Sequence, residues 1–264
     1  MSRKRNHYCI IMDRSGSMLS LRDVAVNGYN ENIQQIKLDA EANPDIDYDI
    51  SLLSFNKNVF EHMWCAKPSE LEEATYESYT PNGGTALYDA MGYAIDKYAA
   101  MEDYSDENTN WLYVIISDGN SNEDQHYGQR ESSWSSYTVP TAAMRERLET
   151  CEKHPRITIT YIGANKASAE RLAKDAHVSV SNVAATDWTN KEAAANAMRG
   201  TRRALRSYSK NVAAGASVKA AFYANSEVQQ DLRSNTTEAV DFASVAIDNS
   251  DLETLVKCSD QAAP

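Results

Sequence analysis

The chain alternates between short apolar runs and longer segments with helical spacing. Residues 8–12 (YCIIM) form a continuous apolar run, which is typical of a strand buried on both faces. Apolar side chains then recur at spacings of three and four until Asn43-Pro44, which predicts a helix. Further strands are expected near 46–52, 59–65, 111–117, 157–163 and 178–180, and further helices near 87–101, 141–153, 168–176 and 191–209.

This order of elements predicts an α/β fold. Strands and helices alternate, except for one early hairpin expected at Asn56-Lys57-Asn58. We therefore expect a central, mostly parallel sheet with one antiparallel edge strand and helices on both faces. Residues 211–264 are acidic and weakly patterned, so we expect one domain over 1–210 and a C-terminal acidic appendage over 211–264 that is partly helical or disordered.

Composition narrows the classes of partner. The formal net charge is −12, from 26 basic and 38 acidic residues, and an acidic surface repels nucleic acid. No apolar stretch approaches the roughly 20 residues of a membrane span, and no secretory signal is recognisable. The four cysteines form no CxxC pair, which disfavours a zinc site or a disulfide framework. We expect a cytoplasmic protein with reduced thiols that binds neither nucleic acid nor membrane.

Three groups of polar residues lie where predicted strands end or a predicted helix begins. Asp13, Ser15 and Ser17 come directly after the first strand, Thr85 opens a helix, and Asp118 ends the strand WLYVIIS. Because loops at the carboxyl ends of parallel strands meet at one edge, we expect these side chains to converge. All of them offer oxygen, the donor that hard cations such as Mg²⁺ prefer.

Each group alone has an ordinary structural explanation. Ser15 and Ser17 are good helix caps, and Asp118-Gly119 is a common turn sequence. The occurrence of all three groups at strand ends, in this order, favours the metal site.

The segments DRSGSM, GGTALYDA and ISDG resemble the metal-ion-dependent adhesion site of von Willebrand factor A domains, in particular stand-alone bacterial and phage members. The segment YIGAN is similar as well, and the resemblance covers about residues 6–210. It implies a Rossmann-like fold with one Mg²⁺ or Mn²⁺ (Ca²⁺ is an alternative) at the top of the sheet. In that arrangement Ser15, Ser17 and Thr85 bind the metal directly, while Asp13 and Asp118 act mainly through water.

The resemblance implies a protein-binding adaptor without catalytic turnover, which captures an Asp or Glu of a partner protein through the metal. A metal-dependent hydrolase or phosphatase is the alternative, although the sequence offers no plausible nucleophile–base pair. A third reading is a self-assembling structural protein whose acidic tail occupies a neighbour's metal site.

Four further residues are candidates for contact with a partner. Asp89 lies one helical turn after Thr85, and His126, Tyr127 and Trp134 lie on the polar segment that follows Asp118. Aromatic side chains on a loop beside a binding site are frequent anchors. Ordinary helix-surface and loop-packing roles are the alternatives for these four residues.

Overall fold

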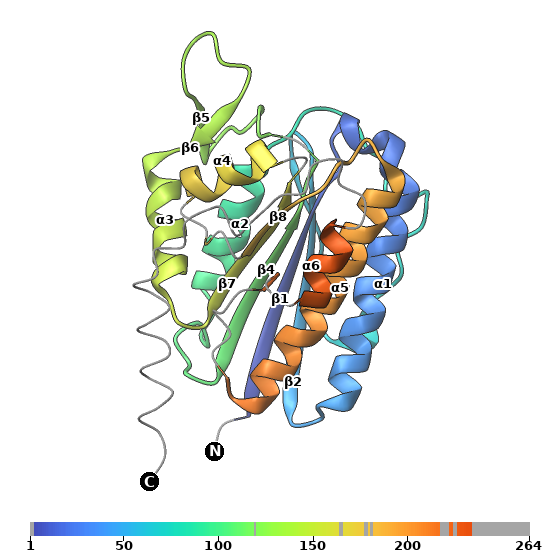
Figure 1. The fold of residues 1–264 in the computed structure, drawn as a ribbon. Coiled ribbons are helices and arrows are strands. Elements are labelled where there is room, and N and C mark those ends of the chain that lie inside the picture. Colours follow the sequence, from blue (N-terminus) through green and yellow to red (C-terminus); the bar gives the residue numbers. More distant parts are fainter. Residues whose placement is uncertain are drawn as a thin grey trace.

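The computed structural model describes residues 3–118, 120–163, 166–176, 179, 182–216, 222–223 and 226–233. A six-stranded sheet in the order β3-β2-β1-β4-β7-β8 forms its centre, and helices cover both faces (Figure 1). The strands of this sheet are β1 (Lys4–Asp13), β2 (Ile46–Phe55), β3 (Val59–Ala66), β4 (Thr109–Ile116), β7 (Ile157–Gly163) and β8 (Val183–Ala185). The helices are α1 (Arg22–Ala42), α2 (Leu87–Ala99), α3 (Ala142–Lys153), α4 (Lys166–Ala176), α5 (Lys191–Ala214) and α6 (Ser226–Arg233).

Strand β1 is buried on both faces because it lies in the middle of the sheet. It pairs in parallel with β2 on one side and with β4 on the other. Tyr8, Ile10 and Met12 pack in the core shared with α1 and α5, whereas Cys9 and Ile11 pack in the core shared with α2 and α3. The two-residue period of a strand therefore sends successive apolar side chains of YCIIM into two different cores.

Only β3 runs antiparallel within the main sheet, where it pairs with β2 at the edge. The parallel pairs β1–β2, β1–β4, β4–β7 and β7–β8 require crossovers, which the helices supply. This architecture confirms the predicted fold class.

Most elements agree with their predicted positions, and two differences are informative. The short last strand is β8 at Val183–Ala185 rather than 178–180, of which 178 and 180 lie outside the described residues. The polar segment expected near 120–138 contains a separate two-stranded hairpin, β5 (Gly128–Arg130) and β6 (Thr138–Pro140). Both strands have three residues, too few to leave a clear alternating pattern in the sequence.

Helix α5 continues through the boundary expected at residue 210 and ends at Ala214, where Gly215 adopts the left-handed conformation. Phe222, Tyr223 and Val228 are buried in the same core as α1 and α5. The ordered fold therefore includes residues beyond 210, and the division into a domain and an appendage stays a prediction. Residues 234–264 lie outside the described part.

Two expectations about composition can be followed here. Among the described residues, none of the helices has the length and apolarity needed to cross a bilayer. Among the described residues, Cys9, Cys65 and Cys151 form no disulfide, and Cys258 lies outside the described part.

Candidate metal centre

Asp13 forms the floor of the predicted site. It is the last residue of β1 and its side chain is fully buried. One carboxylate oxygen accepts from the backbone N–H of Ser15 at 2.7 Å, and the other accepts from the hydroxyl of Ser117 at 2.5 Å. The carboxylate is therefore fixed by the turn that follows β1 and by the residue that follows β4.

Two serine hydroxyls lead from this buried carboxylate to the surface. The Ser15 hydroxyl lies 3.0 Å from that of Ser17, and the Ser17 hydroxyl donates to Asp118 Oδ1 at 2.8 Å. Ser15 is buried, whereas Ser17 is exposed. The structure thus joins Asp13, Ser15, Ser17 and Asp118 from two neighbouring strand ends into one cluster that opens to solvent.

Thr85 belongs to a third loop, which is tied to the first by backbone hydrogen bonds. Gly16 N–H donates to the carbonyl of Gly83 at 2.9 Å, and Asn82 N–H donates to the carbonyl of Arg14 at 2.8 Å. Gly83 has a φ of 74°, which a residue with a side chain rarely adopts. The loop of Thr85 therefore lies against the turn that carries Ser15 and Ser17.

The same residue is held from its other side. The Thr85 carbonyl accepts from the N–H groups of Asn122 and Glu123 at 2.8 and 3.0 Å, and the Asn122 side chain accepts from Thr85 N–H at 2.9 Å. Thr85 is buried between the loop after β1 and the loop after β4. We use the name hydroxyl cluster for Asp13, Ser15, Ser17, Thr85 and Asp118.

Negative charge in the hydroxyl cluster comes from Asp13 and Asp118. Burial raises the pKa of Asp13 to about 7, although the Ser117 hydrogen bond opposes this, and the nearby Asp118 raises it further. Burial also raises the pKa of Asp118. Within the described residues, neither carboxylate forms an ion pair with a lysine or an arginine. A buried acid and a half-buried one, both with neutral hydrogen-bond donors, fit a site that receives a cation.

The kind of donor restricts the kind of ion. Among the described residues, no three His, Cys, Asp or Glu side chains come together in a way that could hold a metal. An ion at this edge would therefore depend on hydroxyl oxygens in addition to the two carboxylates. Such a set suits Mg²⁺, Mn²⁺ or Ca²⁺ and does not suit softer ions.

Asp89 lies near this site but faces the loop after β4. Its two carboxylate oxygens accept from the backbone N–H groups of Gln125, His126 and Tyr127 at 2.7 to 3.0 Å. Asp124 reciprocates by accepting from Asp89 N–H at 2.9 Å. The geometry gives Asp89 a role in fixing this loop against the start of α2, and its predicted contact with a partner stays a prediction.

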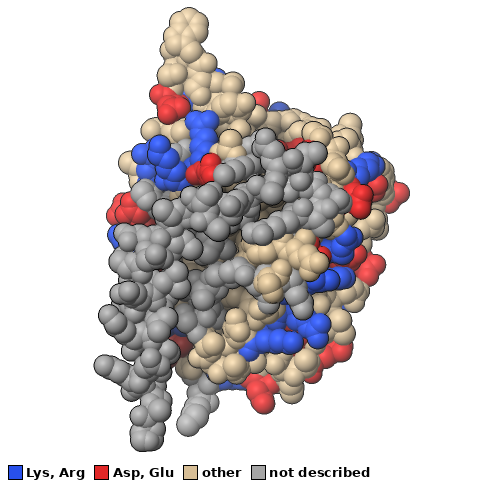
Figure 2. All heavy atoms as spheres, viewed as in Figure 1, with Lys and Arg blue, Asp and Glu red and all other residues tan. Residues whose placement is uncertain are grey.

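The three aromatic candidates differ in exposure. Tyr127 donates to Asp96 at 2.6 Å and packs its ring on Gly92, so it anchors the loop to α2. The His126 side chain is exposed. Trp134 lies in the connection between β5 and β6 and is 95% exposed. Figure 1 shows this hairpin projecting beyond the rest of the molecule, and Figure 2 shows its tip without charged residues.

Sequence reasoning missed two residues that bind Asp13. Ser117 directly precedes Asp118 in ISDG, so its place at a strand end was a usable signal. Tyr79 donates its hydroxyl to the backbone carbonyl of Asp13 from the segment between β3 and α2, and nothing in the local sequence marks that contact.

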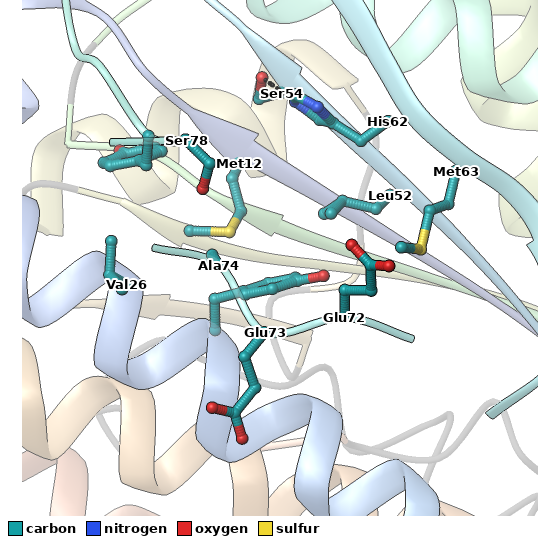
Figure 3. Close-up of a pocket in the computed structure, with 12 residues that line it drawn as sticks. Met12, Val26, Leu52, Ser54, His62, Met63, Glu72, Glu73, Ala74 and Ser78 are labelled. Atoms are coloured by element: carbon teal, nitrogen blue, oxygen red, sulfur yellow. Dashed lines mark hydrogen bonds between the residues drawn. The ribbon is translucent and has the colours of Figure 1, made fainter. Parts of the chain in front are cut away.

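Tyr79 also lines a cavity of about 270 Å³ beside the hydroxyl cluster. The cavity lies between β1, β2 and β3 of the sheet, helix α1 and the segment around Glu72 (Figure 3). Met12 and Leu52 contribute apolar walls, and the Ser54 hydroxyl lies 2.7 Å from His62 Nε2 at its margin. None of the residues of the hydroxyl cluster lines this cavity.

Comparisons with known proteins give fold likeness only. No family model matches the chain, and no curated protein matches it. Among solved structures, the PilB minor pilin from Streptococcus sanguinis is similar at 12% identity, over 78% of this chain and 62% of that one, with a TM-score of 0.50. The pilus adhesin SpaC from Lactobacillus rhamnosus GG is similar at 11% identity, over 83% and 31%, also with a TM-score of 0.50.

A von Willebrand factor type A structure from Catenulispora acidiphila is also similar, at 14% identity over 77% of this chain and 43% of that one, with a TM-score of 0.47. The chain spans less than two thirds of the length of each of these three proteins. The likeness to the pilin and the adhesin is one of fold, and it accords with the mostly parallel six-stranded sheet and its single antiparallel edge strand described above.

Proposed function

We propose that this chain is a binding module without catalytic turnover, which captures a carboxylate of a partner protein through a divalent cation. The hydroxyl cluster would hold Mg²⁺, with Mn²⁺ or Ca²⁺ as alternatives. When bound, the ion supplies a coordination position that accepts an Asp or Glu from outside. The observation that carries this proposal is a fully buried Asp13 carboxylate that has no ion pair within the described residues, beside a pair of serine hydroxyls of which Ser17 reaches solvent.

The residues divide into two roles. The hydroxyls of Ser15, Ser17 and Thr85 would bind the ion, because they are neutral donors and leave it electron-poor toward an incoming carboxylate. Asp13 and Asp118 would orient the hydroxyls and balance the charge. The contact of Ser17 with Asp118 and the hold of Asp13 on the backbone of Ser15 support this division.

The surroundings support a protein as the partner. The β5–β6 hairpin is fixed at its base by Asp89 and Asp124 and presents Trp134 at its tip. A rigid base with an exposed indole is a typical anchor in protein interfaces. Two structures of similar fold are named as a minor pilin and a pilus adhesin, which accords with an interaction or adhesion role.

Two other expectations belong to the proposal. In the described part of the chain, no histidine or cysteine is hydrogen-bonded to the hydroxyl cluster, which disfavours a hydrolase with a nucleophile and base at this edge. A reducing, cytoplasmic environment is the second of these expectations.

Self-association through the acidic tail is the alternative within this proposal. Asp231 on α6 lies 3.2 Å from Arg203 on α5, so this acid is engaged with the chain's own basic helix. The other acids of the tail were also expected to reach a metal site. The side chain of Glu227 is not described, and the acids from Glu238 onward lie outside the described part. Removing residues 234–264 would test their contribution through the mass in solution with and without Mg²⁺.

The metal itself is tested by titrating Mg²⁺ into the wild type and into Ser15→Ala/Ser17→Ala, with calorimetry and thermal melting as readouts. We expect binding and stabilisation of the wild type only. Ser20→Ala, an exposed serine in the same turn, is the matched control and should behave like the wild type. Unchanged Mg²⁺ binding in the double variant would overturn the site.

Carboxylate capture is tested separately, with a library of acidic peptides and matched copies in which each Glu is replaced by Gln. We expect some Glu peptides to bind the wild-type protein in the presence of Mg²⁺. Binding should be lost when a chelator is added, when Glu is replaced by Gln in the peptide, and when the protein carries Asp13→Ala. Equal binding of Glu and Gln copies would contradict the capture of a carboxylate.

A further inference from the structure

Three potential soft-metal ligands lie together at the opposite end of the sheet from the hydroxyl cluster. His7 comes from β1, Cys65 from β3, and Met101 from the turn after α2. Cys65 Sγ lies 3.8 Å from His7 Nδ1 and 3.8 Å from Met101 Sδ. We use the name sulfur cluster for these three residues.

The arrangement of the histidine is the first argument. His7 Nε2 lies 2.9 Å from Asp103 Oδ2, and its Nδ1 lies 3.8 Å from Cys65 Sγ. Donation from Nε2 to the carboxylate leaves the lone pair of Nδ1 on the side of Cys65. A histidine that donates its other ring hydrogen to a carboxylate is the usual arrangement at a metal.

The position of the cysteine is the second argument. Cys65 is the one non-glycine residue with positive φ in the described part of the chain, at 51°. The register of β2 against β3 shifts beside it, and Cys65 N–H donates to the Ser51 hydroxyl at 3.1 Å. A left-handed cysteine inside an irregular strand is a conformation that the surrounding structure must impose, and such residues concentrate at functional sites.

The distances are the third argument. A closed-shell ion binds nitrogen at about 2.0 Å and sulfur at about 2.3 Å. Around one three-coordinate ion, such ligands lie about 3.7 to 4.0 Å from one another. Both measured separations from Cys65 Sγ agree with this spacing. Ordinary packing also brings sulfur atoms this close, so the spacing argues for a site only together with the two preceding observations.

We propose that His7, Cys65 and Met101 form a binding site for Cu(I). A thiolate with a thioether and an imidazole selects this soft ion over Mg²⁺, and the thioether disfavours Zn²⁺. Cys65 would bind as the thiolate and release its proton to solvent. Cys65 and Met101 are half-buried, so an ion can reach them, while His7 is fully buried and stacks on Trp111 at 4.1 Å.

The site is independent of the proposed function, because it shares no residue with the hydroxyl cluster.

The test uses Cu(I) alone, kept reduced under anaerobic conditions, in competition with a chromophoric Cu(I) chelator. The protein carries Cys258→Ser, so that this thiol outside the described residues does not contribute. We expect one equivalent of Cu(I) and an ultraviolet thiolate-to-copper band. Cys65→Ser should abolish both, and Met101→Leu should weaken affinity at least tenfold. Met63→Leu is the matched control, because Met63 is also half-buried but lies in β3, outside the sulfur cluster. It should change neither the stoichiometry nor the affinity of Cu(I) binding.

Asp103→Asn tests the hold on His7 and should weaken Cu(I) binding by about tenfold to a hundredfold. Circular dichroism without metal verifies that each variant is folded. Failure of the parent protein to compete for Cu(I), equal binding by folded Cys65→Ser, or tighter one-to-one binding of Zn²⁺ than of Cu(I) would overturn the proposal.

Discussion

Strand β1 ends at Asp13, at the carboxyl ends of the parallel strands, and carries His7 nearer its amino end. The side chains around these two residues differ in kind. Around Asp13 the neighbouring polar side chains are hydroxyls and a second carboxylate; around His7 they are the Cys65 thiol, the Trp111 ring and the Asp103 carboxylate, with the Met101 thioether next to the thiol. Both residues are fully buried. Burial alone therefore does not determine which kinds of side chain surround each end of β1. The loops and strands that meet at each end supply those side chains.

The two ends are also assembled differently. The hydroxyl cluster takes four of its five residues from the turn after β1 and the end of β4, and backbone hydrogen bonds hold the loop of Thr85 against them. The sulfur cluster takes each residue from a different element and relies on side-chain contacts. The first end should therefore depend on loop scaffolding, and the second on single side chains.

The largest effect on stability is expected from Asp89→Ala, which removes the scaffold beside the hydroxyl cluster without touching its donors. Three backbone N–H groups would lose their shared acceptor, so we expect a loss of about 3 kcal/mol in the free energy of unfolding, measured in urea. Asp23→Ala is the control: this half-exposed acid forms an ion pair with Lys191 and should cost less than about 0.5 kcal/mol. Equal losses for the two variants would contradict the scaffolding role.

Metal addition should separate the two ends in a second experiment. At a hundredfold excess over Kd, an ion that binds only the folded state adds about 2.7 kcal/mol to the free energy of unfolding. We expect Asp13→Ala to lose the response to Mg²⁺ and keep that to Cu(I), and Cys65→Ser to do the reverse. Melting curves of both variants with each ion measure this. Loss of both responses in either variant would break the distinction between the ends.

Asp39 is a buried acid outside both clusters, and its ionisation is expected to change the free energy of unfolding by about 1 kcal/mol. Burial raises the pKa of Asp39 to about 6, although a 2.8 Å hydrogen bond from Gln35 opposes this. Because folding raises this pKa, the protonated acid favours the folded state. Its contribution is complete below about pH 4 and is lost as the pH rises through about 6.

Asp39→Asn should remove this loss and make the variant more stable than the wild type at pH 7 by about 1 kcal/mol. Urea unfolding of both proteins at pH 3.5 and pH 7 measures it, and the difference should shrink at the lower pH. A stability difference between Asp39→Asn and the wild type that grows toward low pH would contradict the predicted direction of the pKa shift.

The smallest effect on stability is expected at the hairpin. Trp134→Ala removes a side chain that is 95% exposed, so the free energy of unfolding should change by less than about 0.5 kcal/mol. Partner capture at the hydroxyl cluster should nevertheless weaken at least tenfold if the indole is an anchor. Val139→Ala, at a buried residue of the same hairpin, should instead lower stability. Unchanged capture by Trp134→Ala would remove the hairpin from the interface.

The sequence by itself determined the fold class and the residues of the hydroxyl cluster as candidates. Apolar runs such as YCIIM reveal a doubly buried strand directly, because a central parallel strand has no polar face. Asp13, Ser15, Ser17 and Asp118 could be placed together because the topology of parallel strands brings their carboxyl ends to one edge. Whether they hold a metal stays a prediction.

Only the tertiary structure decided the contacts that depend on side chains from distant segments. Tyr79 reaches the carbonyl of Asp13 from a loop 66 residues away, and Asp89 turns toward the loop after β4 rather than outward. His7, Cys65 and Met101 carry no shared spacing, since they come from a strand, an edge strand and a turn. Their approach depends on the register of β3 against β2 and on the end of α2, which are set by long-range packing and are not encoded in any local pattern.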